Sequence, residues 1–454
     1  MRGISFAAPL AAPLAVSLGL CACTAPQLGP LECSATVNAN MALAVDVEWS
    51  PAEAGISHVE YGETDSYGMT TPSSGAAKVR LALLGMPADT DVFWRGVTES
   101  ASGTAECVGV THTGTAPAEI PTVTATVNEP GQDDAPYVIG AFFTGRGGSG
   151  SHPQRAAFRR DGTLVWYSFS DEAGTGMDLH YSDDGATILT NTYFGPMGGE
   201  DSEIARTSME GDVIATFATP LAHHVLCELP DDKIAYQALD IRAYTSPDTG
   251  ETANWVGDKI VEVAADGSAE TVFSVWDVVP PRLNSRMERS IYGGLDWTHG
   301  NMLEYDADTG EYVLSLGHAA DILLIDRATG FVNAFYGVDG VAADPPFDYP
   351  HDVNILPNGN LLMFMTDAEG SGAIEYARTD SGLKEVWRGV WGQTPFALGE
   401  ARRLSNGNTF VNEGSGLPLH EETPDGEVVW KLEPSQASIF AQFQLVKSLY
   451  PEEQ

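Results

Sequence analysis

The chain has 454 residues, and its 63 acidic residues outnumber its 23 Lys and Arg residues, which gives a net charge of −40. This charge argues strongly against nucleic acid as a partner, and against docking on anionic lipid by charge alone. Hydrophobic residues make up 43% of the chain, enough for a large core, and so exclude a wholly disordered protein.

The N-terminus is expected to be a targeting segment. Arg2 precedes an apolar stretch, and Leu20-Cys21-Ala22-Cys23 resembles a bacterial lipobox. Residues 1–22 are then a lipoprotein signal peptide, Cys23 carries the lipid, and 23–30 form a tether. An ordinary signal peptide is the alternative. No later stretch approaches about 18 apolar residues, so we expect an exported protein of the periplasm or cell envelope, held to the membrane through its lipid anchor only.

Residues 31–114 show short stretches of alternating polarity separated by Gly, Pro, Asp and Ser, which predicts an immunoglobulin-like β-sandwich of about seven strands. Cys33 opens the first of these strands and Cys107 lies in the last. Since the outer strands of a small sandwich can meet, we expect a disulfide between them. Cys227 is expected to be a small buried residue.

The same region resembles a known module. The string VEWSPAEAGISHVEYGETDSYG, followed by LLGMPADTDVFWR, is similar to fibronectin type III-like modules that precede many exported enzymes. Such a module positions its neighbour and implies no chemistry of its own. Residues 115–136 are rich in Pro, Thr and Ala and are interpreted as a linker.

Residues 137–454 contain repeated hairpins. Each has a strand, an Asp- or Asn-Gly-type turn and a second strand, as in LHYSDDGATILTN, HHVLCELPDDKIAYQ, HGNMLEYDADTGEYVLS, HDVNILPNGNLLMF and EARRLSNGNTFVNEG. The turns recur about every 48 residues, a spacing typical of β-propeller blades, apart from one interval of about 77 residues. That interval, over 240–296, predicts either a hidden blade, which we favour, or a long insertion. Six blades fit best, seven are the alternative, and a β-solenoid fits less well.

Histidines lie at or just before the first strand of several repeats. Because first strands line the channel of a propeller, we expect their imidazoles to converge on the axis, where they can act as nucleophile, acid, base or ligand. These residues are His180, His223, His224, His299 and His351. By contrast, His152 and His420 are expected at the surface or rim, and Trp297 in the core beside the channel.

With its neighbours, this pattern resembles the arylsulfotransferase (aryl-sulfate sulfotransferase) family of exported propellers. The resemblance rests on His223-His224 before LCELPDDKI, on DWTHGN at 296–301, on GHAADILLID at 317–326, on HDV at 351–353 before NILPNGNLLMF, and on ARRLSNGNTF with TPDGEVVW. It implies transfer of a sulfuryl group from a phenolic sulfate ester to a phenol, without the nucleotide donor PAPS and without a cofactor.

The resemblance also implies roles for individual residues. His351 matches the histidine that carries the sulfuryl group. His299 and Asn301 match residues that contact the sulfuryl and phenolic oxygens, as does one of His223 and His224. Neutral imidazole is a competent nucleophile, and fixed donors stabilise charge on the sulfuryl oxygens.

One departure concerns the sulfate-binding cation. The family has Ser-Ser-Arg-His where this chain has Ser315-Leu316-Gly317-His318, so Gly317 replaces an arginine. Because Lys or His would not reproduce a bidentate Arg–sulfate contact, either another cation takes its place, or the substrate differs, or activity is lost. The candidate cations are His318, Arg402, Arg403 and Arg146.

Two other functions remain open. One is a catalytically inactive propeller lipoprotein that binds a ligand or protein partner in its central funnel, and the other is a different histidine-based hydrolase or lyase. No metal site is expected. The Cys and His spacing resembles no zinc site, and Asp306-x-Asp308-x-Gly310 is interpreted as a hairpin turn rather than a calcium loop.

Overall fold

The structure, a computed structural model, describes residues 31–451 except 145–153, 170–175, 177, 183–184, 195–196, 285–286, 290–292, 368–369, 391, 393, 396–397 and 436–437. Cys23, Arg146 and His152 therefore lie outside the described residues. The regular secondary structure of the described part consists of β-strands and one short 3-10 helix, η1 (Val275–Asp277). No helix in this part is long and apolar enough to cross a membrane.

The N-terminal region is a two-sheet sandwich around Trp49, Tyr61 and Trp94. One sheet has the order β1-β2-β5 and the other β4-β3-β6-β7. The strands are β1 (Cys33–Val37), β2 (Val45–Trp49), β3 (Gly55–Gly62), β4 (Met69–Thr70), β5 (Val79–Leu83), β6 (Asp91–Ser100) and β7 (Gly103–His112).

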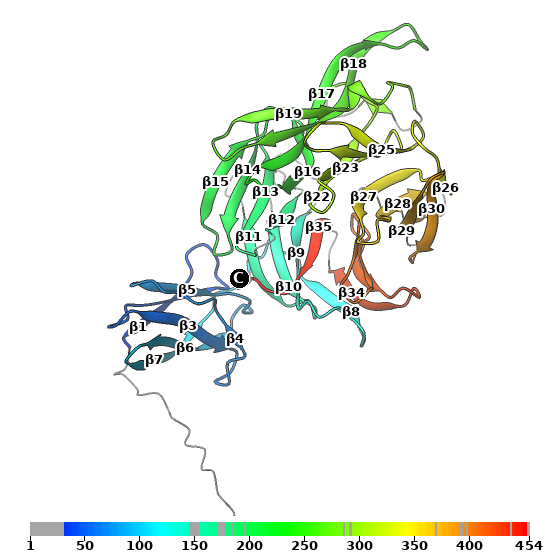
Figure 1. Cartoon of the computed structure of the whole chain (residues 1–454). Helices are drawn as coiled ribbons and strands as arrows, with labels where there is room; N and C mark the ends of the chain where they lie inside the picture. The colour runs from blue at the N-terminus through cyan, green and yellow to red at the C-terminus, as the bar shows by residue number, and fades with distance from the viewer. Residues whose placement is uncertain are drawn as a thin grey trace, which may run out of the picture.

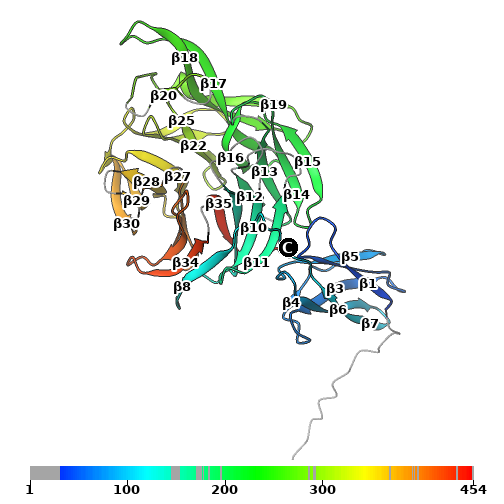
Figure 2. The same ribbon diagram turned by 180° about the vertical axis from the view of Figure 1, so that it is seen from behind.

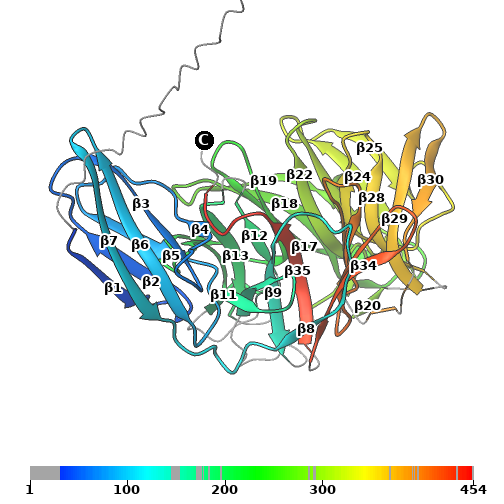
Figure 3. The same cartoon turned by 90° about the horizontal axis from the view of Figure 1, so that it is seen from below.

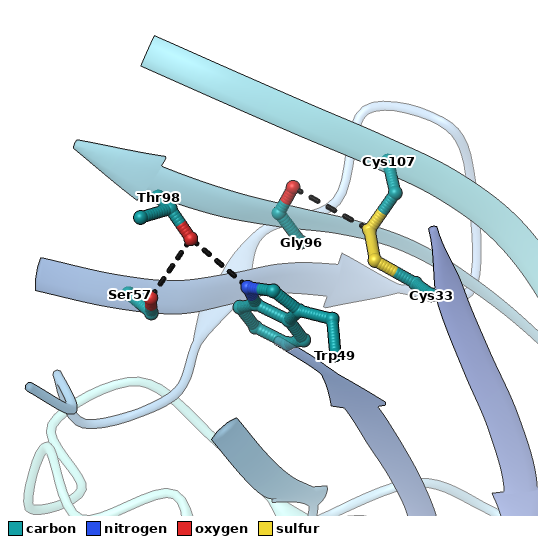
Figure 4. The surroundings of a disulfide bond; sticks show 6 residues. All are labelled: Cys33, Trp49, Ser57, Gly96, Thr98 and Cys107. Atoms are coloured by element: carbon teal, nitrogen blue, oxygen red, sulfur yellow. Dashed lines mark hydrogen bonds between the residues drawn. A yellow bond between two sulfur atoms is a disulfide. The ribbon is translucent and has the colours of Figure 1, made fainter. Parts of the chain in front are cut away.

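The expected disulfide links the first and last strands of this sandwich. Cys33 and Cys107 are bonded, with their Cα atoms 6.2 Å apart, beside Trp49 (Figure 4). A Cβ atom on Gly96 would lie 2.8 Å from the Cys107 sulfur, so glycine is required opposite the bridge. Among the described cysteines, Cys227 is free and buried, as expected.

The rest of the chain forms a propeller, whose six sheets in the described residues are its blades (Figures 1 and 2). Blade 1 has β35 (Ser438–Val446), β9 (Tyr137–Thr144), β10 (Gln154–Arg159) and β11 (Leu164–Phe169); blade 2 has β12 (Leu179–Tyr181), β13 (Thr187–Tyr193), β14 (Ser202–Ser208) and β15 (Val213–Ala218); blade 3 has β16 (Ala222–Glu228), β17 (Ile234–Thr245), β18 (Thr252–Val263), β19 (Ala269–Ser274), β20 (Glu288–Arg289) and β21 (Leu295–Asp296); blade 4 has β22 (Gly300–Asp306), β23 (Glu311–Leu316), β24 (Asp321–Asp326) and β25 (Val332–Gly337); blade 5 has β26 (Ala343–Asp344), β27 (Tyr349–Ile355), β28 (Leu361–Asp367), β29 (Gly370–Thr379) and β30 (Gly382–Arg388); blade 6 has β31 (Glu400–Arg403), β32 (Thr409–Asn412), β33 (Leu419–Glu422), β34 (Val428–Pro434) and β8 (Val123–Asn128).

Both ends of the propeller sequence close the ring. The C-terminal strand β35 pairs with β9 in blade 1, while β8 pairs with β34 at the outer edge of blade 6. Part of segment 115–136, which was expected to be a linker, is therefore a propeller strand. Its alternating VTATVN sequence suits an edge strand, but the surrounding Pro and Thr residues obscure that pattern.

The described residues of the long interval between repeats form no separate blade, so the prediction of a hidden blade was wrong. Strands β17 and β18 pair over twelve residues each and form a hairpin that extends beyond the blade (Figure 1). The remainder of the interval connects blade 3 to blade 4 through η1, β20 and β21. The long-insertion alternative is the correct one, and the six blades come from the five recognised hairpins plus blade 1.

The sandwich packs directly on blades 1 and 2 (Figure 3). Met41, Leu43 and Leu84 of the sandwich share one hydrophobic cluster with Trp166 of the propeller. The Tyr450 hydroxyl, near the C-terminus, donates to the Ala82 carbonyl at 2.7 Å. The two modules therefore share a core rather than being joined by a flexible tether.

Candidate active site

Five histidines from three neighbouring blades meet at one end of the innermost strands. His223 and His224 lie on β16, and their Nδ1 atoms are 2.8 Å apart. The His224 ring stands edge-on to His299, with centroids 5.1 Å apart. His299 in turn stacks on His318 at 4.3 Å. His351 of β27 lines the same cavity as His224, so blades 3, 4 and 5 all contribute imidazoles.

A bulge in each of the three inner strands places these rings. The strand register shifts between Ala222 and Leu226, between Gly300 and Met302, and between His351 and Asn354. At each bulge one non-glycine residue has a positive φ: His224 at 56°, His299 at 50° and Asp352 at 48°. Such conformations are rare for L-residues and cluster at functional sites, because a bulge redirects side chains that strand alternation would send elsewhere.

His351 is held as a neutral base. Its burial, reinforced by nearby His299, lowers the pKa of His351 to about 4. The ring hydrogen-bonds to the Gly399 backbone, whereas the buried Nδ1 has no hydrogen-bond partner among the described residues. Because no described group hydrogen-bonds to Nδ1, the proton is assigned to Nε2 and the lone pair to Nδ1. His351 therefore meets the first requirement for a nucleophile at neutral pH.

The cavity beside His351 is small, about 10 Å³, which is close to the space of one water molecule. Its lining includes His224, Asn301, Asp352 and Glu400. The Asn301 side chain is fixed, since Ser315 donates to its Oδ1 at 2.6 Å and its Nδ2 donates to the Pro350 carbonyl at 3.1 Å. The described cavity admits only a small group, so the rest of a larger ligand would lie outside it.

Buried carboxylates orient the histidines. Asp296 contacts His299 Nδ1 through Oδ2 at 2.7 Å, and its backbone carbonyl lies 2.9 Å from His318 Nδ1. Asp258 pairs with His223 Nε2 at 2.9 Å. Burial would raise the pKa of Asp258, but contacts with His223, Thr298 and the Gly300 N–H outweigh it and lower that pKa. These contacts fix the orientations of His223, His299 and His318.

Other buried carboxylates tie neighbouring blades together. Asp178 accepts from the Leu226 N–H at 2.7 Å, Asp352 from Ala401 at 2.8 Å and Glu400 from Phe443 at 2.9 Å. Burial raises the pKa of Asp178 to about 7 and also raises the pKa values of Asp352 and Glu400. The sequence analysis missed these acids and also Asp258. Asp352 directly follows His351, which was the one available signal.

Gly317 offers little space for a side chain, including the arginine that the family resemblance would place there. A Cβ atom at this position would lie 2.7 Å from the Tyr349 ring and 2.8 Å from Asn301 Nδ2. Tyr349 also faces His299 and His318, with ring centroids 6.2 and 6.1 Å away. A phenol ring thus occupies the space next to the histidines that a Gly317 side chain would enter. The sequence analysis did not single out Tyr349.

Several predicted site residues lie elsewhere. His180 lines a separate space of about 520 Å³ near the other end of the inner strands. Arg402 also lines that space and is paired with Glu304 and Asp352, both at 2.8 Å. Arg403 pairs with Glu375 at the same distance and stacks on Trp387.

Two predictions about residues around the channel have opposite outcomes. His420, expected at the surface or rim, is buried and contacts Glu413 at 2.8 Å, so that prediction was wrong. A strand pattern cannot reveal a buried His that is compensated by acidic partners. Trp297 is fully buried, which confirms its assignment to the core.

The comparisons with known proteins bear on this site. The arylsulfotransferase family model matches residues 141–345. The match contains His223, His224, His299, Asn301 and His318 and ends before His351. A sulfotransferase-family relationship is therefore supported for the part of the chain that supplies four of the five clustered histidines. No curated protein gives a significant match.

Solved structures resemble the chain only distantly. A protein of unknown function from Bacteroides caccae is 16% identical, with a TM-score of 0.43 over 68% of this chain and 98% of its own. Virginiamycin B lyase from Staphylococcus aureus is 12% identical, with a TM-score of 0.40 over 71% and 100%. The periplasmic gluconolactonase of Pseudomonas aeruginosa is 14% identical, with a TM-score of 0.39 over 68% and 98%. At these TM-scores, none of the three matches supports a conclusion about function.

Proposed function

We propose that the protein is an aryl-sulfate sulfotransferase that works without PAPS and passes the sulfuryl group through His351. The observation that supports this proposal most strongly is the neutral, buried imidazole of His351, which lies beside a histidine-lined cavity. Its Nδ1 has no hydrogen-bond partner within the part of the chain that the structure describes. The family match over 141–345 supports this chemistry.

In the proposed first half-reaction, the Nδ1 lone pair of His351 attacks the sulfur of a phenolic sulfate ester. An N–S bond forms, the S–O bond to the phenol breaks, and the phenolate takes a proton from a neighbouring imidazole or water. His299, oriented by Asp296, is our candidate for that proton transfer. In the second half-reaction an acceptor phenol loses its proton to the same group, its oxygen attacks the sulfur, and the N–S bond breaks.

Fixed donors would stabilise the charge on the sulfuryl oxygens. Asn301 uses only one of its two Nδ2 protons on the Pro350 carbonyl, which leaves the other for the cavity that it lines. His224 lines the cavity as well, whereas His223 is engaged by Asp258. We therefore assign the sulfuryl contact to His224 and a positioning role to His223.

The second candidate is an inactive propeller that binds a ligand or protein partner through its funnel. The observation that favours it is the replacement of an arginine by Gly317, with Tyr349 packed over it beside a cavity of about 10 Å³.

An acceptor-dependence assay separates the two candidates. The protein is offered a chromogenic aryl sulfate with and without a phenol, and His351→Gln is compared with His112→Gln, an exposed sandwich histidine. Acceptor-dependent phenol release that His351→Gln abolishes and His112→Gln retains supports the enzyme. Absence of turnover in the unmodified protein favours the binding role.

We also propose that the protein is exported and lipid-anchored through Cys23. The Cys33–Cys107 disulfide supports export, since such bonds persist in oxidising compartments. Cys23→Ala should move the protein from the membrane fraction to the soluble fraction of the envelope, and unchanged fractionation would contradict the anchor.

A further inference from the structure

Glu400 is a buried carboxyl group that reaches the cavity beside His351. It begins β31, and its exposed fraction is 5%. Together with Gln442 it lines both the small cavity and the larger space of about 520 Å³ toward the other end of the inner strands. The Glu400 side chain therefore stands between the histidine-lined site and a second, wider part of the channel.

One oxygen of this carboxyl group is already engaged. Within the described part of the chain, Oε2 accepts the Phe443 N–H at 2.9 Å and lies 3.4 Å from Asn412 Nδ2. These neutral donors belong to β35 and β32, so they hold the side chain between blades 1 and 6. Because both contacts involve Oε2, Oε1 is the oxygen that can carry a proton.

The surrounding charges favour the protonated form of Glu400. The guanidinium of Arg402 pairs with two other carboxylates, those of Glu304 and Asp352, both at 2.8 Å. Since one cation already faces two anions, ionisation of Glu400 would add a further buried negative charge. Burial and the charge of Asp352 together raise the pKa of Glu400 to about 8, although Arg402 opposes the shift.

The imidazoles of the same cavity do not take this proton. Burial lowers the pKa of His351 to about 4 and that of His224 well below its ordinary value. Both rings are therefore weaker bases than the Glu400 carboxylate, and the proton stays on Glu400 at neutral pH. The cavity thus combines a neutral acid, whose O–H can donate a hydrogen bond, with a neutral base whose lone pair can attack.

We propose that Glu400 donates this hydrogen bond to an oxygen of the sulfuryl group at His351, which makes it a catalytic residue. The role rests on the proposed function. The cavity has about the space of one water molecule, so it accommodates one oxygen of that group. A neutral donor stabilises the negative charge that grows on this oxygen during transfer, whereas an ionised Glu400 would repel the anion.

The protonation state is tested first, without turnover. Infrared difference spectra of the mature protein and of Glu400→Gln are compared at about pH 7 for the carbonyl stretch of a protonated carboxylic acid. We expect this band in the unmodified protein, its loss in Glu400→Gln, and a shift of the band when inorganic sulfate is added. No such band, or a band that survives in Glu400→Gln, would overturn the proposal.

Glu311→Gln is the matched control. Glu311 is also buried, with 8% exposed, and it accepts from a neutral donor, the Asn333 amide, at 2.7 Å. It is not among the residues that line either cavity. This variant should therefore keep the infrared band and its response to sulfate.

The affinity for sulfate at different pH values then tests the donor role. Glu400→Gln keeps a neutral N–H donor and an oxygen for the Phe443 N–H, but it cannot ionise. Calorimetric titrations with inorganic sulfate should give similar affinities for both proteins at about pH 6.5 and, at about pH 9.5, at least about tenfold weaker binding by the unmodified protein alone. The same pH dependence in both proteins would overturn the donor role, because a purely structural Glu400 would not affect it.

Turnover separates this proposal from the proposed function. With an aryl sulfate and a phenol, kcat/KM of the unmodified protein and of Glu311→Gln should fall more steeply at alkaline pH than kcat/KM of Glu400→Gln. Identical profiles would overturn the catalytic role. A protein that turns over no aryl sulfate, yet binds sulfate with the expected pH dependence, refutes the proposed function and supports Glu400 as the donor to a bound sulfate group.

Discussion

The pKa of His351 makes a quantitative prediction about stability. Burial lowers that pKa from 6.5 to about 4 in the folded chain, whereas an unfolded chain keeps the ordinary value. As the pH falls below 6.5, the unfolded chain therefore binds a proton at His351 that the folded chain does not bind, and the free energy of unfolding decreases. The stabilising contribution is complete above pH 6.5 and is lost by about pH 4. At about 1.4 kcal/mol per pKa unit, the full loss is about 3 kcal/mol.

His351→Gln removes this titration and leaves the other ionisable groups in place. Urea unfolding at about pH 7 and about pH 4.5 gives the free energy of unfolding of both proteins, and the wild type should lose about 2–3 kcal/mol more than the variant on acidification. Titration of Asp352 and Glu400, which are buried nearby, largely cancels in this double difference. Equal acid sensitivity of the two proteins would refute the neutral, buried His351.

Three further predictions concern packing. Gly317→Ala should destabilise the propeller by about 1–3 kcal/mol, because the new Cβ meets the Tyr349 ring. The loss of stability should be smaller in a Tyr349→Ala background. Additive losses of the two variants in urea unfolding would contradict the contact. Tyr450→Phe removes the hydrogen bonds of the Tyr450 hydroxyl to the sandwich and should lower the free energy of unfolding by about 1–3 kcal/mol. It should also speed protease cleavage between the sandwich and the propeller. An unchanged cleavage rate would contradict the shared core. The double variant Cys33→Ser/Cys107→Ser should lower the unfolding free energy of the sandwich by about 2–5 kcal/mol in guanidinium titrations. Turnover of an aryl sulfate by the propeller should stay unchanged. Equal stability would show that the disulfide is dispensable.

Much of the fold follows from local sequence signals. Tight turns need residues that tolerate positive φ, and Gly359 and Gly407 supply them at φ of 82° and 89°, so the hairpins and their period are readable. The hidden blade was a wrong prediction because β17 and β18 show the same alternation whether a hairpin stays within a blade or extends beyond it. The alternation of polar and apolar residues predicts that a segment is a strand, but tertiary packing determines where that strand ends.

The site is less predictable, for a geometric reason. The histidines converge through bulges at His224 and His299 and beside His351, and one extra residue changes which side chains face the channel. His180, on a strand with a regular register to β13, therefore lines the other end of the channel. No pattern in the sequence indicated that Tyr349 would lie beside the histidines, because its position depends on the absence of a side chain at Gly317.

Trapping the covalent intermediate tests the central claim most directly. The protein is incubated with an aryl sulfate carrying labelled sulfur, without an acceptor, then digested under alkaline conditions that preserve N–S bonds, and the peptides are sequenced by mass spectrometry. We predict one labelled sulfuryl group per chain, on the peptide that contains His351, which disappears when a phenol is added. Label on a different histidine, or none while phenol is still released, would contradict the proposed role of His351.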